Sequence, residues 1–217
     1  MITGVFGLQG AGKTTFLVYA AICGACRRDL SAGRAAWRVP LCDFRYDRVY
    51  TNFPCVVPKK YKKKQKVPIY QLNIDDLGKK DFSNALIIID EISLCLDSRN
   101  YKEFKQEIKE FFALARHYCC DVIYASQSYD HADKRIRDIT SVLLYVDKFG
   151  GWSRVRPIHK QWSIDGTITE GFQLAPPLSS LWLRRKSFYT AFDSWAAPVL
   201  PANDAEMWEY FAAPSKL

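Results

Sequence analysis

The octapeptide Gly7–Thr14, GLQGAGKT, constrains the fold of this chain more than any other feature. It matches the pattern GxxxxGK[ST], in which glycines let the backbone curl around a phosphate group. A short apolar run, residues 2–6, precedes it, and a mostly apolar stretch predicted to be helical, residues 14–28, follows it. A strand, a glycine-rich turn and a helix in this order predict a phosphate-binding loop (P-loop) in an α/β sheet.

The chemistry of such a loop predicts a role for each residue. The backbone N–H groups and the positive end of the helix dipole would hold nucleotide phosphates. Lys13 would reach the β- and γ-phosphates, and the Thr14 hydroxyl would complete the shell of a Mg²⁺ ion. ATP and Mg²⁺ are therefore the predicted ligands, with these nucleotide-binding residues: Gly7, Gly10, Ala11, Gly12, Lys13, Thr14 and Thr15.

An acidic pair, Asp90-Glu91, directly follows the continuous apolar run 85–89. Such runs are typical of central strands in a parallel sheet. In a P-loop fold, a strand beside the phosphate loop delivers an acid to Mg²⁺, usually through water, and that role falls to Asp90. Glu91 would orient and deprotonate the attacking water. A pair of this kind also caps helices, but together with the P-loop it indicates hydrolysis and argues against a small-molecule kinase.

Arg116 and Gln127 flank a further predicted strand, residues 121–126. Gln127, at the carboxyl end of that strand, would lie beside Asp90 and sense the γ-phosphate or hold the attacking water. Arg116, at the other end, is too far from its own nucleotide but is placed to enter a neighbouring subunit's site. A surface arginine near a helix C-terminus is the simpler reading of Arg116 from the residues alone.

Strands and helices alternate along the first two-thirds of the chain. Further strands are expected at 48–57, interrupted by Pro54, at 67–72 and at 141–146, and an amphipathic helix at 104–115. This order predicts a doubly wound, mostly parallel sheet flanked by helices. We expect an ATPase core at 1–149 and a small β-containing extension at 150–217, with a hairpin of residues 152–162 and 167–174 turning at Asp165-Gly166.

Positive charge is concentrated in residues 27–66. This segment has twelve Lys or Arg against three Asp, an excess of nine, whereas the whole chain has a net charge of +8. It includes a lysine run, which is either a solvated loop or a phosphate-contacting patch for nucleic acid or anionic lipid. On a P-loop protein we favour nucleic acid, with this lysine patch as the predicted contact: Lys59, Lys60, Lys62, Lys63, Lys64 and Lys66.

The remaining features favour an intracellular protein. The longest apolar run, residues 16–26, is too short for the ~20 residues that span a bilayer. Seven cysteines without secretory features are typical of free thiols in a reducing compartment. Cys23 and Cys26 form a CxxC pair in the apolar helix, where buried structural thiols are expected rather than a metal site.

As a set, these residues resemble the zonula occludens toxin-like (Zot) ATPases of filamentous phages, within the FtsK–HerA superfamily of hexameric DNA pumps. The resemblance rests on the N-terminal P-loop, residues 51–53 (TNF), and a block that includes Asp90-Glu91, Arg116-His117 and Ser126-Gln127. It implies a RecA/FtsK-like fold, a homo-oligomer, phage DNA as cargo, Gln127 at the γ-phosphate and Arg116 acting in trans.

The resemblance also implies partners. Members that extrude phage usually carry a membrane-spanning helix after the ATPase domain, and these 217 residues are expected to have none. Either a membrane-bound assembly protein recruits the chain to the inner face of the host membrane, or the chain is shortened, or it works in the host cytoplasm like viral genome-packaging ATPases with a capsid partner. A nucleotide-gated adaptor that does not hydrolyse ATP is the alternative from another class.

Overall fold

The computed structural model describes residues 1–30, 45–95, 106–161, 171–176 and 180–192. Their strands form one mixed sheet in the order β3–β2–β4–β5–β1–β6–β7–β8, and β9 also pairs with β7. The strands are β1 (Ile2–Phe6), β2 (Arg48–Thr51), β3 (Ile69–Gln71), β4 (Ala85–Ile89), β5 (Asp121–Ser126), β6 (Val142–Phe149), β7 (Trp152–Gln161), β8 (Gly171–Leu174) and β9 (Leu181–Arg184). The helices are α1 (Lys13–Ala25), α2 (Lys59–Lys62), α3 (Ile92–Cys95), α4 (Gln106–Leu114) and α5 (Lys134–Ile139).

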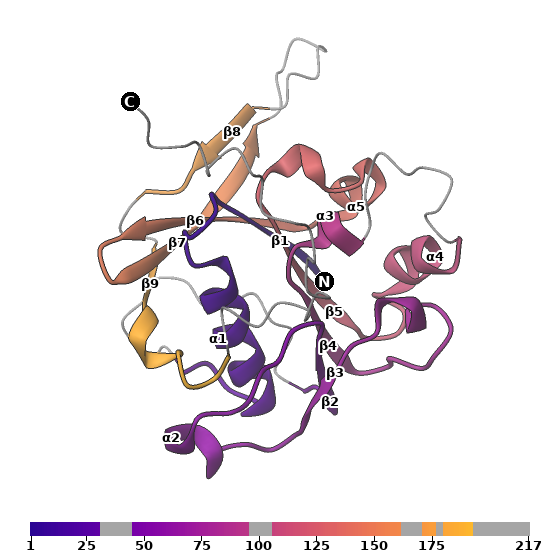
Figure 1. Ribbon diagram of the computed structural model, residues 1–217. Helices are drawn as coiled ribbons and strands as arrows, with labels where there is room; N and C mark the ends of the chain where they lie inside the picture. The colour runs from indigo at the N-terminus through magenta and orange to yellow at the C-terminus, as the bar shows by residue number, and fades with distance from the viewer. Residues whose placement is uncertain (31–44, 96–105, 162–170, 177–179, 193–217) are drawn as a thin grey trace, which may run out of the picture.

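The strands from β3 to β6 pair in parallel, as predicted. The strands β1, β4 and β5 are buried along their whole length, which explains their mostly apolar sequences. α1 covers one face of the sheet, and α3, α4 and α5 lie on the other (Figure 1). Two apolar cores result, one between α1 and the sheet and one beneath α4 and α5. The predicted doubly wound α/β fold is confirmed.

Antiparallel strands extend the sheet beyond β6. β6 does not end at Val146 as predicted but continues to Phe149 and turns through Gly150-Gly151 into β7. Gly150 has a φ of 55°, the conformation that a tight hairpin turn needs. β7 also pairs antiparallel with β8, as the predicted hairpin required, although the predicted turn at Asp165-Gly166 lies outside the described residues. The boundary predicted at 149/150 falls within the β6–β7 turn, and the division into two units stays a prediction.

Several local predictions differ from the structure. β2 ends at Thr51, three residues before Pro54, and is therefore shorter than predicted. The lysine patch begins with one helical turn, α2, rather than a loop, and all six lysines are exposed. The short elements α5 and β9 were not predicted. Within the described segments, no helix combines the length and apolar composition needed to cross a bilayer.

Cys23 and Cys26 lie in the core on the α1 side of the sheet, as expected for structural thiols. Both are free thiols, and burial raises the pKa of Cys23 to about 12. Burial raises the pKa of Cys26 as well, so both thiols stay protonated near neutral pH.

Candidate functional site

The P-loop connects β1 to α1 at the carboxyl edge of the sheet. Close packing explains why two of its positions require glycine. A Cβ atom at Gly7 would lie 2.3 Å from the carbonyl oxygen of Val146. At Gly12, which has a φ of 101°, a Cβ atom would lie 1.9 Å from Ser153 Oγ. Gly12 is also the N-cap residue of α1 and supplies no capping side chain. The N–H groups of the first helical turn are therefore left for an anionic ligand.

Lys13 folds back over this loop. Its Nζ donates to the carbonyl oxygen of Gly7 at 2.9 Å and lies 3.5 Å from Glu91 Oε1. The Lys13 side chain is only 6% exposed, whereas that of Glu91 is 29% exposed. The structure therefore brings together two residues that the sequence separates by a long interval, and it leaves the Glu91 carboxylate accessible to water.

Thr14 and Asp90 form the second contact between the loop and the acidic pair. The Thr14 hydroxyl donates to Asp90 Oδ2 at 2.6 Å. Burial raises the pKa of Asp90, while the hydrogen bonds from Thr14 and from the Glu91 N–H act in the opposite direction. β5 lies between β1 and β4, so the strand that carries Asp90 is one strand further from the P-loop than predicted. The Thr14 side chain nevertheless reaches the carboxylate.

Asn52, in the TNF segment after β2, fixes the backbone of Asp90. Its Nδ2 donates to the Asp90 carbonyl at 3.0 Å, and its Oδ1 accepts from the Asp90 N–H at 2.7 Å. Glu91 then adopts a φ of 47°, which is uncommon for a residue with a side chain. Such a backbone conformation persists only where the surrounding structure holds it, and here Asn52 holds the preceding residue.

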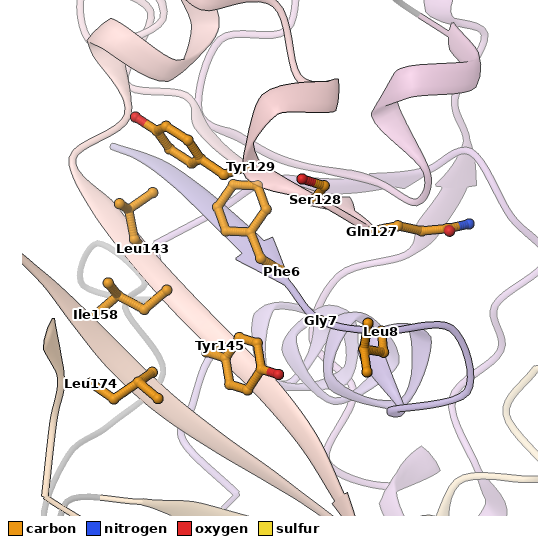
Figure 2. A pocket seen from close by; sticks show the side chains of 10 residues that line it. All are labelled: Phe6, Gly7, Leu8, Gln127, Ser128, Tyr129, Leu143, Tyr145, Ile158 and Leu174. Carbon is orange, nitrogen blue, oxygen red and sulfur yellow. The ribbon is translucent and has the colours of Figure 1, made fainter. Parts of the chain in front are cut away.

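Gln127 lies at the carboxyl end of β5, as predicted. With Gly7 and Leu8 it lines a pocket of about 380 Å³, whose wall is otherwise mostly aromatic and aliphatic (Figure 2). Phe6 and Tyr129 pack edge to face in this wall, with ring centroids 5.4 Å apart. Among the described residues, Gln127 forms no hydrogen bond with Asp90 or Glu91. Gln127 therefore lies beside the P-loop, where it shares the pocket wall with Gly7 and Leu8.

Two groups of predicted residues lie away from the P-loop. Arg116 is exposed, follows α4 and lines a pocket at the amino edge of the sheet with Met1 and Asp121. The lysine patch lies at the far end of α1, where the Ala25 carbonyl accepts hydrogen bonds from the Lys66 and Val67 N–H groups. Since α1 has 13 residues, this end is about 20 Å from the P-loop.

Sequence reasoning missed two side chains that contact the P-loop. Ser153, on β7, donates to the Ala11 carbonyl at 3.1 Å. Arg185, in the 3₁₀ turn Arg185–Ser187 after β9, donates from Nε to Ser153 Oγ at 3.1 Å. Both belong to the antiparallel extension, and neither stands in a recognisable motif.

This chain has the two features that define P-loop NTPase folds. A P-loop lies between a buried strand and α1, and a parallel strand delivers an acidic pair. The family model for the zonular occludens toxin (Zot) matches residues 1–156. The chain belongs to this family. No curated protein matches the sequence.

One solved structure, with a TM-score of 0.50, supports the fold, and two others are similar at lower scores. The N-terminal domain of zonular occludens toxin from Neisseria meningitidis has a TM-score of 0.50 and 17% identity, over 88% of this chain and 98% of that one. The genome packaging NTPase of Sulfolobus turreted icosahedral virus 2, in complex with ATP-gammaS, has a TM-score of 0.47 and 10% identity, over 82% and 97% of the two chains. The KaiC-like protein from Pyrococcus horikoshii has a TM-score of 0.41 and 13% identity, over 84% and 88%.

Proposed function

We propose that this protein is a Mg²⁺-dependent ATPase that works as an oligomeric motor, a hexamer, and moves phage DNA during filamentous virion assembly. One observation carries the proposal: the acidic pair meets the P-loop at two points, Thr14 with Asp90 at 2.6 Å and Lys13 with Glu91 at 3.5 Å. Membership of the Zot family supports the same assignment. The motor would act in the host cytoplasm, recruited to the inner face of the membrane by an assembly partner.

In the proposed reaction, residues of the P-loop bind and orient ATP. The loop N–H groups and the first turn of α1 would bind the phosphates. Lys13 would exchange its contacts with Gly7 and Glu91 for the β- and γ-phosphates. Released from Lys13, the Glu91 carboxylate would orient a water molecule and accept its proton as the water oxygen bonds to the γ-phosphorus and ADP leaves. Gln127 would hold this water or sense the γ-phosphate.

The hard oxygen ligands that Mg²⁺ prefers are present at the loop. The Thr14 hydroxyl and the Asp90 carboxylate would hold the ion, the latter through water. Mg²⁺ would supply positive charge to the phosphate oxygens. Asn52 contributes by holding the Asp90 backbone, so that the carboxylate faces Thr14.

Arg116 would act in trans. Its position at the amino edge of the sheet, on the opposite side from the P-loop, keeps it from its own nucleotide and leaves it exposed to a neighbouring subunit. In a ring, this arginine would stabilise negative charge on the neighbour's phosphates. A monomer that hydrolyses ATP at the full rate would contradict this part of the proposal.

The test is the steady-state ATPase rate across protein concentration, with single-stranded DNA, double-stranded DNA or none. We expect a rate that rises with protein concentration and with DNA and that disappears in Glu91→Gln. Preference for single strands would favour extrusion, and preference for duplex would favour genome packaging. Tight ATP binding with negligible turnover would instead indicate a nucleotide-gated adaptor. Phosphoryl transfer to a metabolite without a DNA response would indicate a small-molecule kinase.

The lysine patch is the proposed DNA contact. All six lysines are exposed, and the hydrogen bonds from the Lys66 and Val67 N–H groups to the Ala25 carbonyl hold this segment at the C-terminal end of α1, remote from the P-loop. Replacing Lys62, Lys63 and Lys64 by glutamine should weaken DNA binding and reduce its salt dependence, because each phosphate contact contributes to the salt slope. ATP affinity without DNA should stay unchanged.

A further inference from the structure

Two side chains of the antiparallel extension hold one peptide group of the P-loop. The carbonyl oxygen of Ala11 accepts a hydrogen bond from Ser153 Oγ at 3.1 Å, and Arg185 Nη2 lies 3.5 Å from the same oxygen. Arg185 Nε also donates to Ser153 Oγ at 3.1 Å. Ser153 is completely buried. The Ala11 carbonyl is therefore held from outside the loop by a connected pair of donors.

The direction of this carbonyl decides what the loop offers to a phosphate. In a trans peptide the C=O of Ala11 and the N–H of Gly12 point in opposite directions. Gly12 has a φ of 101° and no Cβ, so this peptide can turn over at lower cost than one that precedes any other residue. If it turned over, a carbonyl oxygen would face the bound phosphate and the Gly12 N–H would point away.

We propose that Ser153 and Arg185 are positioning residues for nucleotide binding: they hold the Ala11–Gly12 peptide so that the Gly12 N–H faces the phosphates. The ligand, ATP, is taken from the proposed function. Arg185 lies beyond residues 1–156, which the family model matches, so the extension completes the nucleotide site. The proximity of Ser153 also explains why position 12 must be glycine, since a Cβ there would lie 1.9 Å from Ser153 Oγ.

The test compares Arg185→Ala with Arg184→Ala. Arg184 is the preceding residue, carries the same charge and is exposed, so its replacement controls for the loss of a cation near the site. ATP affinity is measured by calorimetry in Mg²⁺ buffer at fixed salt, together with KM and kcat. We expect Arg185→Ala to bind ATP about tenfold more weakly, because it loses hydrogen bonds from a charged donor. Arg184→Ala should stay within about twofold.

Ser153→Ala removes the bridging hydroxyl without changing charge, and we expect a loss of about three- to tenfold. Because both residues act on one peptide, the double variant should lose less than the product of the two single losses. Arg185→Lys should recover part of the affinity. At saturating ATP the kcat of each variant should stay within about threefold, because a residue that only positions the loop acts on binding of substrate and transition state alike.

Several outcomes would overturn this inference. Equal losses in Arg184→Ala and Arg185→Ala would show a long-range charge effect, and unchanged affinity in Arg185→Ala would show that the peptide needs no support. Independent, multiplicative losses in the double variant would show that the two residues do not share a target. Should Arg185→Ala prove unfolded by circular dichroism, Ser153→Ala alone decides. A natural chain that binds no ATP would contradict the proposed function itself, which distinguishes the two failures.

Discussion

Asp90 lies at the carboxyl edge of the sheet and Asp121 at the amino edge, and both accept hydrogen bonds from residues distant in sequence. Asp121 is 3% exposed and accepts from the Tyr46 hydroxyl and from the amino group of Met1. Asp90 is half-buried and accepts from Thr14, a residue of the P-loop itself. The same chemical group thus joins parts of the fold at one edge and faces a ligand-binding loop at the other. The two roles differ because the donors differ: Tyr46 and Met1 at Asp121, and Thr14 of the P-loop at Asp90.

The largest expected effect concerns turnover at the carboxyl edge. Glu91→Gln removes the proposed base, and we expect kcat for ATP to fall by about 10²–10⁴. The melting temperature should move by less than about 2 °C, because the Lys13–Glu91 pair is partly exposed and such pairs contribute little stability. ATP hydrolysis and calorimetry measure the two quantities. Unchanged turnover would remove Glu91 from the proposed mechanism.

The next effect concerns stability at the amino edge. Asp121→Ala removes the acceptor of the Tyr46 hydroxyl and the Met1 amino group, and we expect a loss of about 1–3 kcal/mol in the free energy of unfolding. Asp81→Ala is the control, because the Asp81 side chain is 70% exposed and should contribute far less. Urea unfolding of both variants tests this. Similar losses in the two would show that Asp121 has no special structural role.

Asp90→Asn is expected to increase the stability of the fold, by less than Asp121→Ala decreases it. Because burial raises the pKa of Asp90, folding favours the neutral carboxyl. The stability that this neutral form provides is present below the usual carboxyl pKa of about 4 and is lost as the pH rises through the raised pKa. An asparagine removes the charge, and with its oxygen accepting from the Glu91 N–H its amide nitrogen can donate to the Thr14 hydroxyl. We expect the melting temperature at pH 7 to rise and Mg²⁺-dependent ATP binding to weaken. At pH 3 the rise should disappear, and a rise of equal size there would contradict this explanation.

The smallest expected effect has the opposite pH dependence and involves Asp147 on β6. Hydrogen bonds from Arg154, at 2.9 and 2.6 Å, hold the pKa of Asp147 below its usual range. Its contribution is therefore present at neutral pH and is lost as the pH falls from about 4 through that lowered pKa. At pH 7 the free energy of unfolding of the natural chain should exceed that of Asp147→Asn by less than about 1 kcal/mol. Urea unfolding of both chains should show a smaller difference in the free energy of unfolding at pH 2.5 than at pH 7.

The sequence predicted the parts of the site that depend on local order. The P-loop motif contains its own turn and helix start, and the apolar run before Asp90 specifies a buried strand. Both therefore appear where expected. The position of Gln127 at the carboxyl edge of the sheet could be predicted because it comes directly after the last residue of a strand.

The contacts made by the extension could not be predicted. Ser153 and Arg185 are 142 and 174 residues away from Ala11 along the chain, and no spacing rule connects them. They meet the P-loop only because β6 and β7 form a hairpin and β9 pairs with β7. The strand β9 has only four residues, and α5 only six, too few for a clear periodic pattern. Pairing with β7, rather than local preference, determines β9.

The amide of Asn52 has a consequence for how the protein ages. It both donates to and accepts from the backbone of Asp90, a combination that no carboxylate provides. Deamidation to aspartate would replace the donor with an acceptor and add a negative charge next to Asp90. A stored sample would then lose activity through one slow covalent change while remaining folded. Peptide mapping of aged samples, set beside their remaining ATPase rate, would reveal it.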